Sequence, residues 1–258
     1  MIIIKSPHEM EYIRQACKLT ADTLELLIEA VKPGVTTQEL DTIAEQNIRQ
    51  HGGVPSCLGY YGYPATICAS VNEQVVHGIP SGRKLKDGDV ISIDLVSSIN
   101  GYHGDSCVTV PVGNRVNKKT MQLLKVTEEA LFKGIEQAVV GNHVGDISHA
   151  VQTYAESFGY GVVRDFVGHG IGRDMHEDPQ IPNYGKPGHG PELRPGMVIC
   201  IEPMINMGTF KVRVLEDDWT AVTQDSKPAA HFEHTVLITD QGPEILTMRG
   251  TPRLITSK

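Results

Sequence analysis

The feature that most constrains the fold is a ten-residue pattern that occurs twice. Residues 85–94 read LKDGDVISID and residues 193–202 read LRPGMVICIE, so the two copies are offset by 108 positions. Each copy is a strand-like apolar run that ends in a carboxylate, Asp94 or Glu202. The tripeptide His77-Gly78-Ile79 precedes the first copy, and His169-Gly170-Ile171 precedes the second. Two matches in the same order predict a duplicated structural unit.

Helical patterns precede the strands in both halves. Ser6-Pro7-His8-Glu9 combines an N-cap, a proline at the first helical position and a capping box, and apolar residues then recur at helical spacing as far as Val31. A second helix is expected from Thr37 to near Gly52. The second half repeats this plan, with helices expected over Lys118–Val139 and Asp146–Phe158. The expected fold class is therefore α+β, with two helices and a β-hairpin in each unit.

The chain has 258 residues and no low-complexity linker between its halves. We therefore expect a single catalytic domain over residues 1–258, with pseudo-symmetric halves at about 1–113 and 114–258, around a central antiparallel sheet.

Composition excludes several classes of partner. The net charge of −8 disfavours general binding to a phosphate backbone, so no specific nucleic acid is expected. No apolar stretch approaches the length of a membrane span. The five cysteines are odd in number and form no CxxC pair, which is typical of reduced thiols in a cytoplasmic protein.

The first hairpin places two aspartates together. Val90–Val96 is a predicted strand, Asn100-Gly101 is a hairpin turn signal, and Ser106–Val112 is the predicted return strand. If the turn is centred on Asn100-Gly101, Asp105 faces Val96 and shares a face with Asp94, with the two backbones roughly 7–8 Å apart. Two like charges that close are unfavourable without a cation.

Three further residues extend this cluster. Glu202 ends one apolar strand, Glu233 begins another, and His169 lies in the Gly-rich stretch from Val163 to His176, which follows a strand expected over Val162–Val167. Singly, each carboxylate is explained by a structural ion pair and the histidines by a surface loop. Together they form an oxygen-rich cage with one imidazole, which suits Mn, Fe, Co or Zn. Five protein ligands suit two ions roughly 3.5–4 Å apart better than one catalytic zinc.

Nearly the whole chain resembles the type I methionine aminopeptidases, whose pita-bread fold is shared with creatinase and prolidase. The motifs that carry the resemblance begin with IKSPHEMEYIRQA and continue with SVNEQVVHGIP, DGDVISIDL, GYHGDS, GHGIGRDMHE, PGMVICIEPM, LEDDWTAVT and FEHTVLITDQG. One departure is Met175, where the family usually has an aromatic residue. The resemblance is to the short bacterial form, without a zinc-binding N-terminal extension or the long insertion of type II enzymes.

The resemblance implies roles for individual residues. The implied metal ligands, for two divalent ions (Co, Mn, Fe or Zn), are Asp94, Asp105, His169, Glu202 and Glu233. The implied catalytic residues are His77 and His176, which contact the scissile amide without binding metal, and Glu202, which exchanges a proton. The implied methionine pocket, to which His77 and His176 also contribute, consists of Cys57, Tyr60, Tyr63, Cys68, Met175 and Trp219. Without the resemblance, Tyr60, Tyr63 and Trp219 would be read as ordinary core aromatics.

The resemblance also implies an activity. A dinuclear metal-bound hydroxide would remove the initiator methionine from deformylated nascent polypeptides when the second residue is Gly, Ala, Ser, Thr, Cys, Pro or Val. A cytoplasmic monomer with transient ribosome contact is expected. One alternative is a prolidase or proline-specific aminopeptidase of the same fold, which usually carries an extra N-terminal domain. Another is a non-catalytic binding paralogue, which the five filled ligand positions disfavour.

Overall fold

The computed structural model describes residues 1–250 of the chain, and its helices form two pairs. The pairs are α1 (Pro7–Ala30) with α2 (Thr37–Gln50), and α3 (Lys118–Glu136) with α4 (Val144–Ser157). Ser6 caps α1 in a capping box with Glu9, as the sequence predicts, and Thr36 caps α2 in the same way with Glu39. Within the described part of the chain, no helix is both long and apolar enough to cross a membrane.

A curved antiparallel sheet joins the two halves. Its strands follow the order β1-β4-β5-β14-β9-β7-β8, with β2 also paired to β4 and β15 to β14. The strands of this sheet are β1 (Val54–Pro55), β2 (Ile67–Val71), β4 (Val90–Ile99), β5 (Tyr102–Pro111), β7 (Gly168–Gly170), β8 (Glu177–Ile181), β9 (Val198–Ile201), β14 (Glu233–Thr239) and β15 (Gly242–Ile245). Because β14 pairs with both β5 and β9, one continuous sheet spans both halves.

Two small sheets and a short 3₁₀ helix complete the described structure. One sheet has the order β13-β10-β6 and the other β11-β12-β3. Their strands, with the 3₁₀ helix, are β3 (Gln74–Val76), β6 (Gly161–Val162), β10 (Met204–Asn206), β11 (Val212–Val214), β12 (Ala221–Thr223), β13 (Ala229–His231) and η1 (Tyr60–Gly62).

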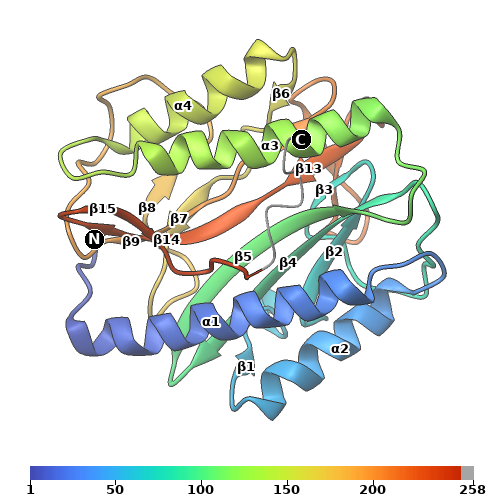
Figure 1. Ribbon diagram of the computed structural model, residues 1–258, viewed down its shortest axis with the longest axis horizontal. Helices are drawn as coiled ribbons and strands as arrows, with labels where there is room; N and C mark the ends of the chain where they lie inside the picture. Colours follow the sequence, from blue (N-terminus) through green and yellow to red (C-terminus); the bar gives the residue numbers. More distant parts are fainter. Residues whose placement is uncertain (251–258) are drawn as a thin grey trace.

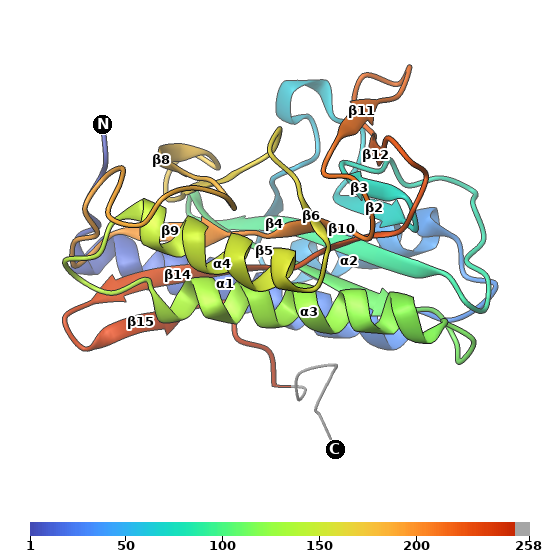
Figure 2. The ribbon, with the colours of Figure 1, turned by 90° about the horizontal axis from the view of Figure 1, so that it is seen from above.

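The two faces of the central sheet have different neighbours. Helices α1 and α3 pack on its strands, and Figures 1 and 2 show the helices gathered on one side, with the β8 and β11–β12 segments on the other. Inward-facing apolar residues of β4 such as Ile93 and Leu95 join the main core. Gly104 lets α1 approach closely, because a Cβ there would lie 2.4 Å from the backbone nitrogen of Cys17. The alternate residues of the same strands, including Asp94, Val96 and Asp105, face the opposite side.

The predicted hairpin register is confirmed. Ile99 pairs with Tyr102 and Val96 with Asp105, and Asn100 and Gly101 form the turn, both with positive φ. The return strand is longer than expected, since β5 already begins at Tyr102. The strand expected over Val162–Val167 is wrong for most of its length. Val162 pairs with β10 in a small sheet, and the chain then crosses to the central sheet, where β7 begins at Gly168.

Candidate active site

One cavity of about 170 Å³ lies on the face of the central sheet opposite the helices. It brings together every residue that the sequence assigns to a site. Its lining residues are Cys57, Tyr60, Tyr63, Cys68, His77, Asp94, Val96, Asp105, His169, Met175, His176, Glu202, Trp219 and Glu233. A larger open cleft of about 630 Å³ beside the start of α4 has Asp178 as its one lining carboxylate, so metal or acid–base chemistry is concentrated in the smaller cavity.

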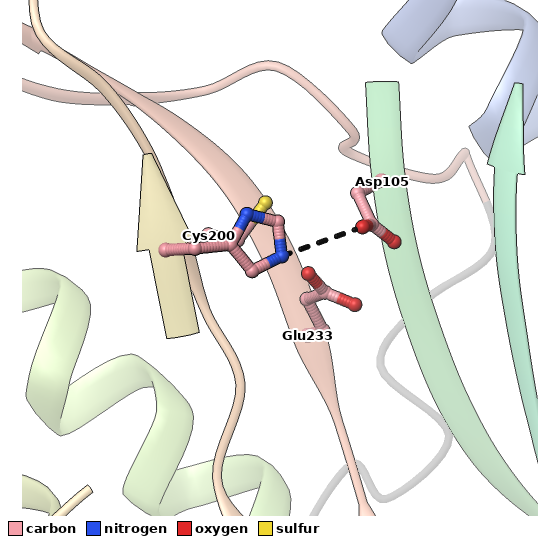
Figure 3. Close-up of side chains that lie close together, drawn as sticks. Asp105, Cys200 and Glu233 are labelled. Carbon is pink, nitrogen blue, oxygen red and sulfur yellow. Dashed lines mark ion pairs between the residues drawn. The ribbon is translucent and has the colours of Figure 1, made fainter. Parts of the chain in front are cut away.

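The four carboxylates come from four neighbouring strands or their ends. Asp94 and Asp105 lie on β4 and β5 as diagonal neighbours, two residues apart in register, as the hairpin turn predicts. Glu202 directly follows β9, and its carbonyl accepts a hydrogen bond of 3.0 Å from the Asn183 side chain. Glu233 is the first residue of β14. Figure 3 shows Asp105 and Glu233 pointing toward one another from adjacent strands.

Burial makes this cluster electrostatically unfavourable in the absence of a cation. Asp105 and Glu233 are only 4% and 2% exposed, and Asp105 Oδ1 and Glu233 Oε1 have no hydrogen-bond partner. Burial, followed by neighbouring carboxylates, raises the pKa of Asp105, Glu202 and Glu233 well above the ordinary range. Burial also raises the pKa of Asp94 to about 7. Unpartnered buried carboxylate oxygens of this kind are what a divalent cation would satisfy.

His169 presents a free nitrogen lone pair to the carboxylates. Its Nδ1 lies 2.9 Å from the carbonyl oxygen of Gly170, which can only accept, so Nδ1 carries the proton. Burial lowers the pKa of His169 to about 3, which keeps the ring neutral. Nε2 therefore faces Asp105 Oδ2 at 3.7 Å and Glu202 Oε1 at 3.5 Å with a lone pair rather than a proton. A metal ion among the three groups would convert this repulsion into coordination.

Cys200 is a sixth candidate donor, which sequence reasoning missed. One ligand atom from each of Asp105, His169, Cys200 and Glu233 lies within 4.8 Å of the others (Figure 3). The alternation of side chains along β9 could have indicated Cys200, because residues two positions apart on a strand, such as Cys200 and Glu202, share a face. However, its thiol lies 3.6 Å from Thr235 Oγ1, and burial raises its pKa well above 9. The Cys200 side chain also packs in a cluster with Ile13 and Cys17 of α1 and does not line the cavity, so the carboxylates and His169 remain the better donor set.

Two further histidines face the cavity from outside the carboxylate cluster. His176 Nδ1 lies 2.7 Å from the Tyr60 hydroxyl, and its ring centroid is 4.3 Å from that of His169. Burial lowers the pKa of His176, and it lowers that of His77 to about 4. Both rings are therefore neutral near pH 7 and can donate or accept one hydrogen bond.

The backbone at His77 is strained. His77 has φ = 59°, in the left-handed region that residues other than glycine seldom adopt. The next residue must be glycine, because a Cβ on Gly78 would lie 2.6 Å from the carbonyl oxygen of Ala69. The Gly78 N–H donates to Ser70 Oγ of β2 at 3.1 Å, so this turn packs directly against β2, and the His77 ring lies edge-to-face against Phe166.

An apolar pocket adjoins the carboxylates in the same cavity. Its buried members form one cluster with Tyr60, Ile79 and Trp219 at the margin. The buried members are Cys57, Tyr63, Ala65, Cys68, Val96 and Met175. Sequence reasoning missed Val96, although the predicted hairpin register already placed it opposite Asp105 on the cavity face.

Comparison with known proteins identifies the family. Residues 11–240 match metallopeptidase family M24. The chain is 56% identical to the methionine aminopeptidase of Clostridium acetobutylicum, over 96% of this chain and 99% of that protein. It is 54% identical to methionine aminopeptidase 1 of Bacillus subtilis, with the same coverage.

Solved structures agree with this assignment. The methionine aminopeptidase from Rickettsia prowazekii has a TM-score of 0.94 at 42% identity, covering 96% of this chain and 100% of that one. The prolidase from Pyrococcus furiosus has a TM-score of 0.79 at 26% identity, covering 97% of this chain but 66% of that one. The pita-bread fold is thereby confirmed, and this chain belongs to metallopeptidase family M24, among its methionine aminopeptidases.

Proposed function

We infer that this chain is a metal-dependent aminopeptidase that removes N-terminal methionine from polypeptides whose second residue is small. The observation that carries this inference is a single cavity in which an apolar, thiol- and aromatic-lined pocket adjoins four carboxylates and His169. Its dimensions and lining suit one flexible apolar side chain next to a hydrolytic centre.

We propose that Asp94, Asp105, His169, Glu202 and Glu233 together hold two divalent ions, with Mn, Fe, Co and Zn as the candidates. The unpartnered oxygens of Asp105 and Glu233 and the free Nε2 of His169 support this assignment. Bound ions of this kind supply Lewis acidity and lower the pKa of coordinated water.

The remaining polar residues supply proton transfer and hydrogen bonding. Glu202, whose carboxyl pKa is raised by burial, is placed to take and return a proton during peptide-bond hydrolysis. His176 accepts a hydrogen bond from the Tyr60 hydroxyl at Nδ1, so its proton is on Nε2. From there His176 donates a hydrogen bond to the reacting carbonyl oxygen. His77, whose ring packs edge-to-face against Phe166, is the second donor or acceptor at the scissile amide.

Substrate choice follows from the residues that surround the first side chain of the substrate and from those beside its second residue. Cys57, Tyr63, Cys68, Met175 and Trp219 surround the first side chain and favour methionine, because a polarisable thioether packs well against sulfur and aromatic groups. His169, Met175 and His176 line the cavity on this side, and we propose that they leave room only for a small second residue. A formyl group would remove the basicity of the substrate amine and add bulk beside the carboxylates, so deformylated N-termini are the expected substrates.

The test is a panel of Met-X-Ser peptides with X varied, assayed by mass spectrometry with Mn, Fe or Co and after chelation. We expect cleavage for X = Gly, Ala, Ser, Thr, Cys, Pro or Val and rejection of X = Lys or Phe. Discrimination within the small set should be graded, since one methylene changes binding by about 1–3 kcal/mol. Chelation should abolish activity, and N-formyl-Met-Ala-Ser should be inert.

Comparable kcat/KM for X = Ala and X = Lys would refute this substrate assignment. Preferential cleavage of X-Pro peptides that lack methionine would instead favour the prolidase alternative, whose representatives share the fold at lower identity. Full activity in protein verified as metal-free by elemental analysis would contradict the proposed role of the carboxylate cluster.

A further inference from the structure

A fourth histidine, His231, lies behind the active site and has no role in the function proposed above. It is the last residue of β13, two positions before Glu233, and it is 2% exposed. Its backbone is held firmly to β5, since its N–H donates to Thr109 Oγ1 at 2.8 Å and its carbonyl accepts from the same hydroxyl at 2.8 Å. The backbone that carries the imidazole is therefore held in a fixed position relative to β5, the strand that carries Asp105.

The His231 ring is polar, buried and unpartnered. Neither Nδ1 nor Nε2 has a hydrogen-bond partner among residues 1–250. Buried polar side-chain atoms are hydrogen-bonded in the large majority of cases, so two such atoms on one ring call for an explanation. His231 is also absent from the residues that line the cavity, so it does not face the substrate directly.

The nearest charged group explains the orientation of the ring. His231 Nε2 lies 3.7 Å from Glu202 Oε2, while the other oxygen of Glu202, Oε1, lies 3.5 Å from His169 Nε2. The Glu202 carboxylate is thus placed between two imidazoles, with one oxygen toward each. A movement of roughly 0.5 Å would bring Nε2 and Oε2 of the His231–Glu202 pair within the outer limit of a hydrogen bond, near 3.2 Å.

We propose that His231 is a positioning residue, which donates a hydrogen bond from Nε2 to Glu202 Oε2 and so keeps Oε1 directed at His169 and the metal cluster. This inference rests on the proposed metal-dependent function, because it assigns the two oxygens of Glu202 to different tasks. A carboxylate held at one oxygen presents the other in a single orientation, which both coordination and proton transfer require.

Three substitutions distinguish the effect of a hydrogen-bond donor at Nε2 from the effect of side-chain volume and from that of a donor at Nδ1. His231→Gln places an amide N–H close to the Nε2 position, His231→Asn places one close to Nδ1, and His231→Leu fills the space with no donor. His149→Leu is the matched control, because His149 is an exposed histidine on α4, remote from the cavity.

Two readouts test the proposal, and one does not require a substrate. Calorimetric titration of the metal-free protein with Mn²⁺ should show roughly tenfold weaker binding for His231→Leu and His231→Asn, and near-wild-type binding for His231→Gln and His149→Leu. On Met-Ala-Ser with saturating Mn²⁺, kcat should fall roughly tenfold for the Leu and Asn variants with little change in KM. His231→Gln should restore most of the lost kcat.

Equal impairment of His231→Gln and His231→Leu would overturn the proposal, as would unchanged metal affinity and kcat in His231→Leu. If His231→Leu does not fold, the comparison of the Gln and Asn variants decides. If the wild-type protein fails to cleave any Met-X-Ser peptide, the proposed function is wrong, yet the calorimetric series still tests whether His231 positions Glu202.

Discussion

At the scale of single residues, the Tyr60 hydroxyl determines how His176 can act. The 2.7 Å contact at Nδ1 makes Nε2 the protonated nitrogen if Tyr60 donates. Tyr60→Phe keeps the ring that borders the methionine pocket but removes this donor. We expect kcat for Met-Ala-Ser to fall about tenfold, the kinetic equivalent of one hydrogen bond of about 1–1.5 kcal/mol, with little change in KM.

The neighbouring Tyr61 supplies the control for this substitution. Its side chain is 86% exposed, so Tyr61→Phe should leave both kinetic constants near the wild-type values. An unaltered kcat in Tyr60→Phe would show that the His176 tautomer does not depend on this contact. A rise in KM without a fall in kcat would instead assign Tyr60 to methionine binding alone.

The site residues that could be predicted from sequence are those with a strand or motif signal. Asp94 and Asp105 were predictable because a two-residue turn fixes the register of a hairpin, and the alternation along β4 then fixes the face. His231 was not, because its importance depends on a contact with Glu202, from a strand about thirty positions earlier. The sequence AHFEH contains no local pattern that distinguishes a buried catalytic neighbour from an ordinary strand histidine.

At the scale of elements, a buried ion pair holds the Gly-rich loop in place. Lys5 Nζ contacts Glu177, and the two side chains are 2% and 5% exposed. Lys5 also donates its backbone N–H to the Gly196 carbonyl at 2.9 Å, so the segment before α1 is attached to the central sheet. Because Glu177 directly follows His176 and opens β8, this pair fixes the end of the loop that carries His169 and His176.

Breaking this pair should be costly. Lys5→Met leaves the Glu177 carboxylate buried without its partner, and the free energy of unfolding should fall by about 3–5 kcal/mol in urea denaturation. The double variant Lys5→Met/Glu177→Met, which removes both charges, should recover much of that loss. Additive destabilisation in the double variant would show that the pair does not act as a unit.

The segment around β6 shows where element prediction from sequence fails. The segment Val162–Val167 has apolar residues on both sides of Arg164 and Asp165 and was predicted to be one strand. In the structure Val162 pairs with β10 of a small sheet, whereas Gly170, further along the chain, pairs with β9 of the central sheet. Which strand partners are available, β10 for Val162 and β9 for Gly170, depends on the tertiary arrangement. The local pattern therefore predicted that a strand lies here. It did not predict that the strand ends before the exposed Arg164 and Asp165, because that depends on the tertiary arrangement.

At the scale of the whole molecule, the central sheet connects the two repeated halves. We propose that the chain is one catalytic domain with halves at about residues 1–113 and 114–258, because β14 pairs with β5 of the first half and β9 of the second. The carboxylates come from both halves, so the active site forms only when the halves are joined. Stability of the whole molecule and metal binding at the site should consequently be coupled.

This coupling predicts how pH affects the metal-free protein. The folded-state pKa of Asp94 is raised by burial to about 7, and those of Asp105, Glu202 and Glu233 are raised well above normal. Such groups favour folding at low pH, and their contribution is lost as pH rises toward the folded-state pKa. His77 and His169 act in the opposite sense, because their folded-state pKa values of about 4 and about 3 lie below the unfolded value near 6.5.

The two effects separate above about pH 7.5, one unit above the unfolded histidine pKa near 6.5, where the histidines are neutral in both states and only the carboxylates titrate. The Tm of chelated protein should therefore fall between about pH 7.5 and 8.5, and Mn²⁺ should raise Tm most at the upper end of that range, because protons compete less with the cation for the carboxylates there. Differential scanning calorimetry at several pH values, with and without metal, measures both trends. A Tm of the chelated protein that stays constant or rises across this interval would contradict the inferred repulsion among Asp94, Asp105, Glu202 and Glu233. Asp105→Asn provides the internal check, since removing one of the four charges should reduce the pH-dependent loss in the metal-free state while weakening the stabilisation by Mn²⁺.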